Sequence, residues 1–283
     1  MKYMYFFKKI SAIVLVLSVI CCLSFAFVGC NNPDDKLPPD TRPTINIGSD
    51  EYTPYFYIDE SGDYAGIDVE IATEAFSRMG YKANFVQIVW SERDAKLSSG
   101  EIDCLWGSFS MDGRGDRYTW AGPYLTSRQV VAVSKNSNIK KLSDLADKSV
   151  ACQSTTKPDE LLSSNDDPRI PQIKNLYCFP NFDQVFASLR KSYVDAIAGH
   201  ETAMISYMKS TSGEYVILEE SLAEVHLGVA FSLTNNTDIP SRLTATLAEM
   251  ASDGTTGNII AKYKLLADRV SRRPTSRHRF WSR

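Results

Sequence analysis

The chain has 283 residues, of which 43% are hydrophobic and 23% are charged, a composition typical of globular proteins and a length that accommodates two small domains. Nine of its 31 Lys and Arg lie in the terminal segments 1–29 and 269–283. The body of the chain, residues 30–268, therefore has 22 basic residues and all 34 Asp and Glu, which gives it a net charge near −12. So acidic a body argues against nucleic acid as a partner.

The first 29 residues have the pattern of a secretion signal. Lys2, Lys8 and Lys9 precede an apolar run from Ile10 to Val28, and a short apolar run with basic residues before it and small residues after it is typical of a cleaved signal peptide. A transmembrane anchor is the alternative, although the run is marginal in length for one. The segment 30–43 is rich in Pro and Asp and lacks apolar periodicity, so we expect an extended tether.

Apolar runs of strand type and of helix type follow, which predicts an α/β fold. The expected strands are 44–48, 81–89, 102–106, 128–133, 149–152, 175–179, 193–198 and 225–231. The expected helices are 69–79, 92–98, 140–147, 182–192, 202–209 and 239–252. Asp68 stands at the start of the first helix, where we expect it to be the N-cap residue.

The polar stretch from Gly107 to Tyr124 is the first candidate for a binding site. It follows the expected strand 102–106, and ligands of open α/β sheets lie beyond the carboxyl ends of strands. Ser108, Ser110 and Arg114 supply two hydroxyls and a guanidinium, which can hold a carboxylate with two parallel N–H bonds. The alternative is a solvated loop whose arginine points at water.

A second candidate site follows the expected strand 149–152. Thr155 and Thr156 precede Pro158, and proline is common in the first turn of a helix, whose unpaired N–H groups favour an anion. A plain helix cap explains the same residues equally well.

The cysteine spacing indicates neither a disulfide framework nor a zinc motif. Of six cysteines, three lie in or at the end of the signal: Cys21, Cys22 and Cys30. The remaining three, Cys104, Cys152 and Cys178, are widely spaced within apolar runs. We therefore expect three buried free thiols, with no metal and no cofactor.

The order and spacing of these motifs resemble bacterial extracellular solute-binding proteins of family 3, the polar amino-acid type. The family loop reads G-x-T-x-T-x-x-R and then D-P-Y, and Arg114 keeps the family spacing to Pro123-Tyr124. The upstream part is one residue shorter, so either Ser108 or Ser110 takes the place of the family Thr, and alignment on Ile102-Asp103 favours Ser110. Further matching segments lie at 48–56, 66–71, 150–156, 193–196 and 253–260, so the resemblance spans about Thr44 to Tyr263.

The resemblance implies which residues contact a ligand. They are Asp50, Tyr52, Tyr55, Trp90, Ser108, Phe109, Ser110, Arg114, Thr155, Thr156, His200 and Glu201. For the aromatic residues, packing within the fold is the alternative. His200 departs from the family, which has at this position an Asp that holds the ligand's α-ammonium group, because a neutral His offers no full negative charge. Glu201 or Asp50 then supplies the charge, or the ligand is not an ordinary α-amino acid.

The resemblance also implies a two-lobed α/β fold, the periplasmic-binding-protein-like fold of type II, with two Rossmann-like domains joined by two hinge strands. The expected boundaries are 44–132 with 230–268 for lobe 1, 133–229 for lobe 2, and 269–283 for a basic tail. Such a protein would be the monomeric solute-binding component of an ABC importer and would deliver a small polar amino acid or related carboxylate-bearing solute to a permease in the membrane. The alternative is a lyase similar to cyclohexadienyl dehydratases, in which His200 and Glu201 would act as acid and base.

The end of the signal resembles the lipobox of bacterial lipoproteins. The sequence Phe27-Val28-Gly29-Cys30 ends in the Cys that receives a diacylglyceryl group in those proteins, although Phe27 stands where Leu is usual. We therefore expect Cys30 to be lipidated and the protein to be held at the outer side of the cell membrane by this lipid anchor.

Overall fold

The computed structural model describes residues 40–263, except 165, 212 and 236. Several expected segments thus lie outside the described residues: the expected signal peptide 1–29, the expected lipidation site Cys30, most of the expected tether 30–43, and the expected tail 269–283. The described residues from Arg42 onward form one compact unit. Among its described residues, no helix is long and apolar enough to cross a membrane.

A mixed sheet of eight strands runs through this unit, in the order β4-β1-β5-β10-β6-β9-β7-β8. The outer strands pair in parallel, β1 with β4 and β5, and β7 with β8 and β9, whereas the long strands β6 and β10 pair antiparallel in the middle. The strands are β1 Thr44–Ser49, β4 Lys82–Gln87, β5 Cys104–Leu105, β6 Thr119–Ser134, β7 Ser149–Gln153, β8 Asn175–Phe179, β9 Ala196–His200 and β10 Tyr215–Phe231. A separate hairpin joins β2 Tyr57–Ile58 to β3 Tyr64–Ala65.

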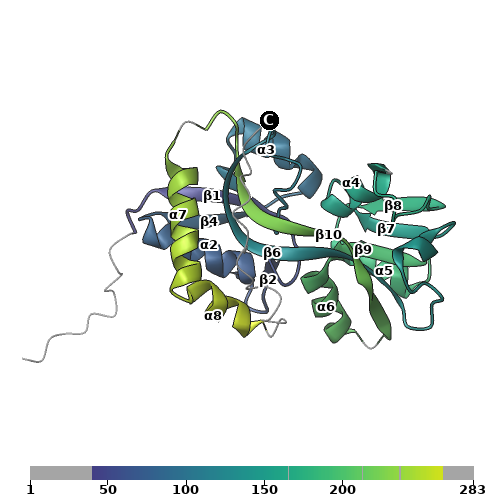
Figure 1. The fold of residues 1–283 in the computed structure, drawn as a ribbon. Helices are drawn as coiled ribbons and strands as arrows, with labels where there is room; N and C mark the ends of the chain where they lie inside the picture. The colour runs from purple at the N-terminus through teal and green to yellow at the C-terminus, as the bar shows by residue number, and fades with distance from the viewer. Residues whose placement is uncertain (1–39, 165, 212, 236, 264–283) are drawn as a thin grey trace, which may run out of the picture. The chain divides into compact units, whose positions relative to one another are not determined.

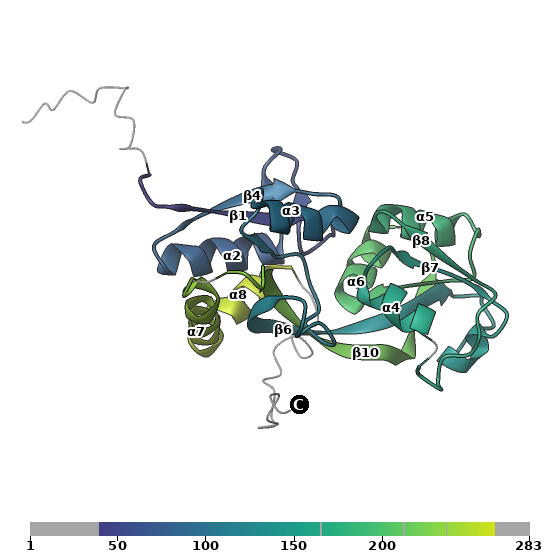
Figure 2. The same cartoon turned by 90° about the horizontal axis from the view of Figure 1, so that it is seen from above.

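The helices gather in two groups around the two ends of the sheet (Figure 1 and Figure 2). Around β1 and β4 lie α2 Ile67–Arg78, α3 Arg93–Ser99, α7 Ile239–Ser252 and α8 Thr255–Lys262, and around β7 and β9 lie α4 Lys157–Ser164, α5 Phe182–Arg190 and α6 Glu201–Ser210. Short 3₁₀ turns occupy Trp90–Glu92 and Leu142–Leu145. Because β6 and β10 pair along their length and reach both groups, they are the two long connections between them.

The main hydrophobic cluster reaches across both groups of elements. It includes Ile47 of β1 and Phe186 of α5, and the ring of Tyr52, in the loop after β1, lies 4.8 Å from the ring of Phe182 at the start of α5. The side chain of Asn181 caps α5 by accepting a hydrogen bond from the backbone N–H of Gln184 at 3.0 Å, which satisfies one of the unpaired groups of the first turn. The ring contact between Tyr52 and Phe182 thus packs the loop after β1 against the start of α5.

The expected N-cap role of Asp68 is wrong. The N-cap residue of α2 is Gly66, with φ of 130°, and a Cβ atom there would stand 2.2 Å from the carbonyl oxygen of Tyr55, so only glycine fits. Asp68 lies inside the first turn and is buried, and its carboxylate accepts hydrogen bonds from the Ser108 N–H at 2.7 Å and the Tyr124 hydroxyl at 2.8 Å. Asp68 therefore ties helix α2 to both ends of the loop 107–124. Burial raises its pKa to about 7.

Most expected elements are confirmed, with shifted ends. The strand expected at 193–198 is Ala196–His200, because Tyr193 still closes the end of α5 by donating its N–H to the carbonyl of Ser188 at 2.9 Å. The strands expected at 128–133 and 225–231 are much longer, because they continue to pair with each other beyond the expected ranges, over Thr119–Ser134 and Tyr215–Phe231. The expectation of three buried thiols is wrong for Cys178, which is exposed.

Candidate functional site

A small pocket lies at the strand ends between the two groups of helices. Its walls come from the loop after β1, the loop after β5, the middle of β6, the turn between β7 and α4, and the end of β9. The cavity has a volume of about 30 Å³, which is room for roughly two water molecules. Side chains from both sides fill the rest, and the contacts among them determine what the pocket can bind.

Arg114 is the central cation of this pocket. The loop 107–118 turns back through a hydrogen bond from the Arg114 N–H to the Met111 carbonyl at 3.0 Å, and the guanidinium lies 4.9 Å from the centre of the Phe109 ring. Its Nη1 donates to the carbonyl of Ser110 at 2.9 Å, and the residue is only 1% exposed. Burial lowers the pKa of Arg114, yet a guanidinium stays charged at any physiological pH. A buried, oriented positive charge requires an anionic partner.

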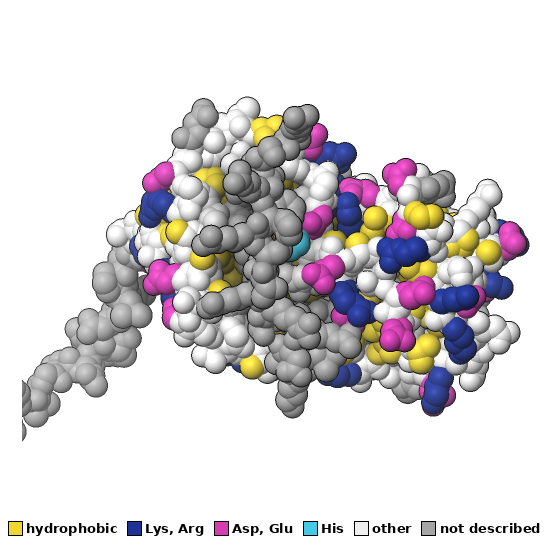
Figure 3. Space-filling view, viewed as in Figure 1, with side chains coloured by type: hydrophobic (Ala, Val, Ile, Leu, Met, Phe, Trp, Pro, Cys, Tyr) yellow, Lys and Arg dark blue, Asp and Glu magenta, His cyan; other side chains and the backbone are white. Residues whose placement is uncertain are grey.

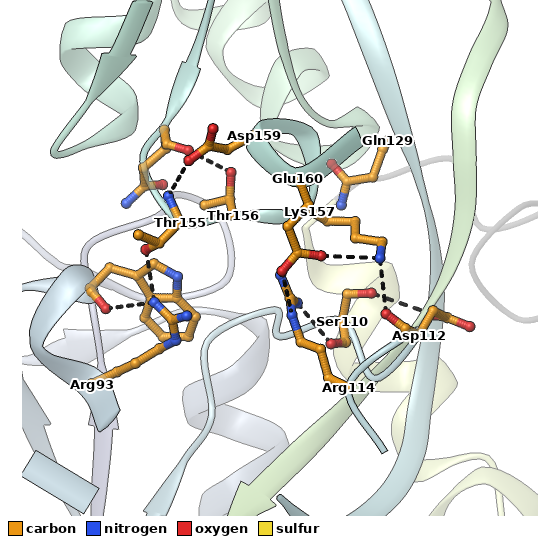
Figure 4. Close-up of polar contacts among 12 residues, drawn as sticks. Arg93, Ser110, Asp112, Arg114, Gln129, Thr155, Thr156, Lys157, Asp159 and Glu160 are labelled. Carbon is orange, nitrogen blue, oxygen red and sulfur yellow. Dashed lines mark hydrogen bonds and ion pairs between the residues drawn. The ribbon is translucent and has the colours of Figure 1, made fainter. Parts of the chain in front are cut away.

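Glu160, in the first turn of α4, is that partner in the structure (Figure 4). Its Oε1 accepts hydrogen bonds from Arg114 Nε at 3.0 Å and from Arg114 Nη2 at 2.6 Å, while its Oε2 lies 3.2 Å from Lys157 Nζ. Burial alone would raise the pKa of Glu160, but the charges of Arg114 and Lys157 outweigh it and hold the pKa below its usual value. Lys157 also donates to the Asp112 carbonyl at 3.0 Å. The two sides of the pocket are therefore joined by an ion pair.

A second guanidinium lies next to the pocket, near the same Phe109 ring as the first. Arg93, at the start of α3, donates through Nη1 to the Trp90 carbonyl at 3.0 Å and to the Thr155 hydroxyl at 2.8 Å. Its guanidinium lies over the rings of Trp90 and Phe109, at 5.1 Å and 5.4 Å from their centres. Together with Arg114, it makes this side of the pocket positive, which favours an anionic group there.

An acidic group lies in the pocket wall formed by the loop after β1. Asp50 is 8% exposed, and its Oδ2 accepts a hydrogen bond from Gln153 Nε2 at 2.6 Å, while the same amide also donates to the Pro180 carbonyl at 3.2 Å. Burial raises the pKa of Asp50 to about 6. Asp50 is therefore mostly ionised at neutral pH, and a bound cation would favour this form further.

His200, at the end of β9, is a neutral wall of the pocket. Burial lowers its pKa to about 4, so the ring carries no charge at neutral pH. Its ring nitrogens lie 3.0 Å and 3.2 Å from Gln129 Nε2, and its backbone N–H donates to the Tyr52 hydroxyl at 3.2 Å. The buried Oε1 of Gln129 has no hydrogen-bond partner among the described residues, which leaves an acceptor at this end of the pocket.

The structure brings most of the expected ligand-binding residues together. Those that line the pocket are Asp50, Tyr52, Trp90, Ser108, Phe109, Ser110, Arg114, Thr156 and His200. The other three do not line it. The Tyr55 ring lies behind His200 at 5.8 Å, the Thr155 hydroxyl accepts from Arg93, and the Glu201 carboxylate lies 3.4 Å from Arg128 Nε. Whether any of the twelve contacts a ligand stays a prediction.

Several residues of the site escaped the sequence reasoning. They are Arg93, Gln129, Gln153, Lys157 and Glu160. Gln153 and Gln129 each offered one signal, a polar residue at the end of or within an otherwise apolar strand. Glu160 offered none, because an acidic residue in the first turn of a helix is common for its effect on the helix dipole alone.

One protein-family model matches nearly all of the described residues. The model for bacterial extracellular solute-binding proteins, family 3, matches residues 45–265. The match covers every element from β1 to α8, and with them both sides of the pocket.

Comparisons with single proteins agree with this match. The L-cystine-binding protein TcyA of Bacillus subtilis is 24% identical over 271 residues, which cover 90% of this chain and 97% of TcyA. The L-cystine-binding protein TcyJ of Escherichia coli K12 is 26% identical over 218 residues, covering 76% of this chain and 80% of TcyJ. Among solved structures, Tv2483 bound to L-arginine has a TM-score of 0.71 at 24% identity and covers 78% of this chain and 90% of that one. This likeness confirms the expected type II periplasmic-binding-protein fold.

Proposed function

Because the chain belongs to the bacterial extracellular solute-binding proteins of family 3, we propose that it captures a small polar α-amino acid and delivers it to the permease of an ABC importer. Relatives named for L-cystine and a structural neighbour bound to L-arginine support this class of solute. The observation that carries the proposal is Arg114, a guanidinium 1% exposed whose Nε and Nη2 both donate to a carboxylate oxygen. A solute carboxylate would take the place of Glu160 on these two donors.

Two other lining residues of the pocket suit the ammonium group of the same solute. Asp50 is ionised at neutral pH, since its pKa is about 6, and the unpartnered Oε1 of Gln129 supplies a further acceptor. Glu201 is the less suitable anion, because its carboxylate lies outside the pocket lining and near Arg128. Asp50 therefore replaces, in this proposal, the acidic residue that the family has at the position of His200.

Capture requires the pocket to open, because about 30 Å³ is too small for an amino acid. We place the hinge in β6 and β10, the two long strands that connect the groups of helices. The moving lobes are then 44–132 with 230–268 and 133–229. Closure would bring Arg114 of the first lobe and the α4 turn of the second around the solute.

The proposal is tested by measuring the affinity of Arg114→Ala for the solute. Titration calorimetry against a panel of amino acids first identifies the solute, and the variant is then measured with it. Leaving the solute carboxylate without its buried partner should cost about 3–5 kcal/mol, or a few hundred-fold or more in affinity. Arg117→Ala, which removes an exposed arginine from the same loop, is the matched control. Affinity of the Arg114 variant within threefold of wild type would refute the site.

We also propose that Cys30 carries the lipid that holds the protein at the membrane. The support is the sequence Phe27-Val28-Gly29-Cys30 and the family's extracellular character. In the native bacterium, Cys30→Ser should move the protein from the membrane fraction to the soluble fraction. Retention of the variant in the membrane fraction would instead indicate that the apolar run is a transmembrane anchor.

The lyase alternative finds less support in the geometry. A general acid or base works best when its pKa lies near the working pH, and that of His200 is lowered to about 4. Glu201 is not placed to assist, since it lies outside the pocket lining.

A further inference from the structure

Three side chains able to bind a metal meet on the part of the fold built by β7, β8 and α4. The parallel register sets Cys152 of β7 opposite Cys178 of β8, so both side chains project from the same face of the sheet. Asp159 lies in the first turn of α4 and reaches the same point. The three residues lie outside the pocket lining.

The distances among the three groups match those of a tetrahedral metal site. The sulfur atoms of Cys152 and Cys178 are 3.9 Å apart, Cys178 Sγ is 3.3 Å from Asp159 Oδ1, and all three atoms lie within 4.8 Å of one another. Zinc bonds of about 2.3 Å to sulfur and 2.0–2.2 Å to oxygen, at tetrahedral angles, require separations of about 3.8 Å between sulfurs and about 3.5 Å from sulfur to oxygen. The separation between the two sulfurs and that from Cys178 Sγ to Asp159 Oδ1 are each within about 0.2 Å of these values.

The surroundings supply an entrance for an ion. Cys178 is exposed and Asp159 is partly exposed, whereas Cys152 is buried, so an ion could enter from one side and keep a water molecule as its fourth ligand.

We propose that Cys152, Cys178 and Asp159 form a binding site for a thiophilic divalent cation, of which Zn²⁺ is the best match. Two thiolates select soft or borderline metals over Mg²⁺ and Ca²⁺. Asp159 Oδ2 already accepts the Thr155 N–H at 2.7 Å, a contact of the kind that fixes a metal ligand in place. An ion here would hold the turn between β7 and α4, and the site would be structural.

Cobalt is the probe for this site, because tetrahedral Co²⁺–thiolate coordination gives intense visible bands and a near-ultraviolet charge-transfer band. The full chain, kept reduced, should bind one Co²⁺ with these bands, Zn²⁺ should abolish them by displacement, and Zn²⁺ should raise the melting temperature. Cys178→Ala, a change at an exposed position, should remove both the bands and the shift, and Asp159→Asn should weaken binding at least tenfold.

Cys104→Ala is the matched control, because it removes a thiol of the other helix group and leaves the cluster intact. The chain contains six cysteines, so only bands that survive in Cys104→Ala and vanish in Cys178→Ala support the site. Absence of the bands in the wild-type chain would overturn the proposal. So would bands of equal intensity in Cys178→Ala, provided that its thermal unfolding shows a folded protein.

Discussion

The ion pair between Arg114 and Glu160 predicts that the protein carries an internal competitor for its own solute. Glu160 Oε1 occupies both Arg114 Nε and Nη2, the donors that we propose for the solute carboxylate. Glu160 lies on the α4 side of the pocket and Arg114 on the other side. A solute must therefore exchange one carboxylate for another, and the substitution Glu160→Gln should make this exchange easier.

The size of the effect follows from the burial of the pair. Hydrogen bonds to charged groups contribute about 1.5–3 kcal/mol. The side chain of Glu160 is 35% exposed while that of Arg114 is 2% exposed, so solvent screening reduces the contribution to about 1–1.5 kcal/mol. Removing the competing charge should then raise solute affinity about five- to tenfold. The unliganded variant should also melt at a lower temperature, because Arg114 loses its anionic partner.

Calorimetry of the wild type and Glu160→Gln with the same solute measures the change. Glu214→Gln is the matched control, because it removes the same charge from an exposed pair with Lys135, and it should leave affinity unchanged. An unchanged affinity in Glu160→Gln would mean that Glu160 does not compete. A tenfold loss would mean that Glu160 contacts the solute instead, and either result would refute the reasoning.

Three further predictions concern pH and the backbone. Solute affinity should fall about tenfold per pH unit below pH 6, because protonation of Asp50, with its pKa of about 6, removes the partner of the ammonium group. In calorimetry, Asp50→Asn should bind the solute weakly, with an affinity that does not change with pH. A steep pH dependence of affinity in that variant would exclude Asp50 as the titrating group. The buried Asp68 carboxyl has its pKa raised from 3.8 to about 7, so its contribution to stability is full below pH 3.8 and is lost as the pH rises through 7. In urea unfolding, the stability of Asp68→Asn relative to wild type should therefore increase between pH 4 and pH 7. A difference in stability that stays constant over this range would contradict the raised pKa of Asp68. Gly66→Ala should lower the free energy of unfolding by at least about 2 kcal/mol, because its Cβ would stand 2.2 Å from the Tyr55 carbonyl oxygen at a φ of 130°. Gly62→Ala is the control, since at its φ of 87° a Cβ meets nothing within 4 Å, and it should cost only about 1 kcal/mol; equal losses would show that the close approach at Gly66 does not matter.

The amino-acid sequence by itself determined most of the helices and strands and, of the candidate site, the side that carries Arg114. Strand and helix follow from the local period of the apolar residues, so β1, β8 and α7 lie where the periodicity predicts them. Arg114 and its neighbouring serines could be identified because a polar, glycine-rich stretch directly after a buried strand lies at the ligand-binding edge of such sheets. These inferences need only residues that are close together in the chain.

Tertiary structure alone decided which distant groups face one another. Glu160 stands 46 residues from Arg114, and nothing local to either residue marks the pair. The same holds for Gln153 and Asp50, and for Cys152 with Cys178, which become neighbours only through the parallel register of β7 and β8. The burial that moves the pKa of Asp50 and Asp68 upward also depends on the complete packing of the fold. Charge, register and burial across the chain are properties of the whole structure, whereas periodicity and turn chemistry are properties of a few consecutive residues.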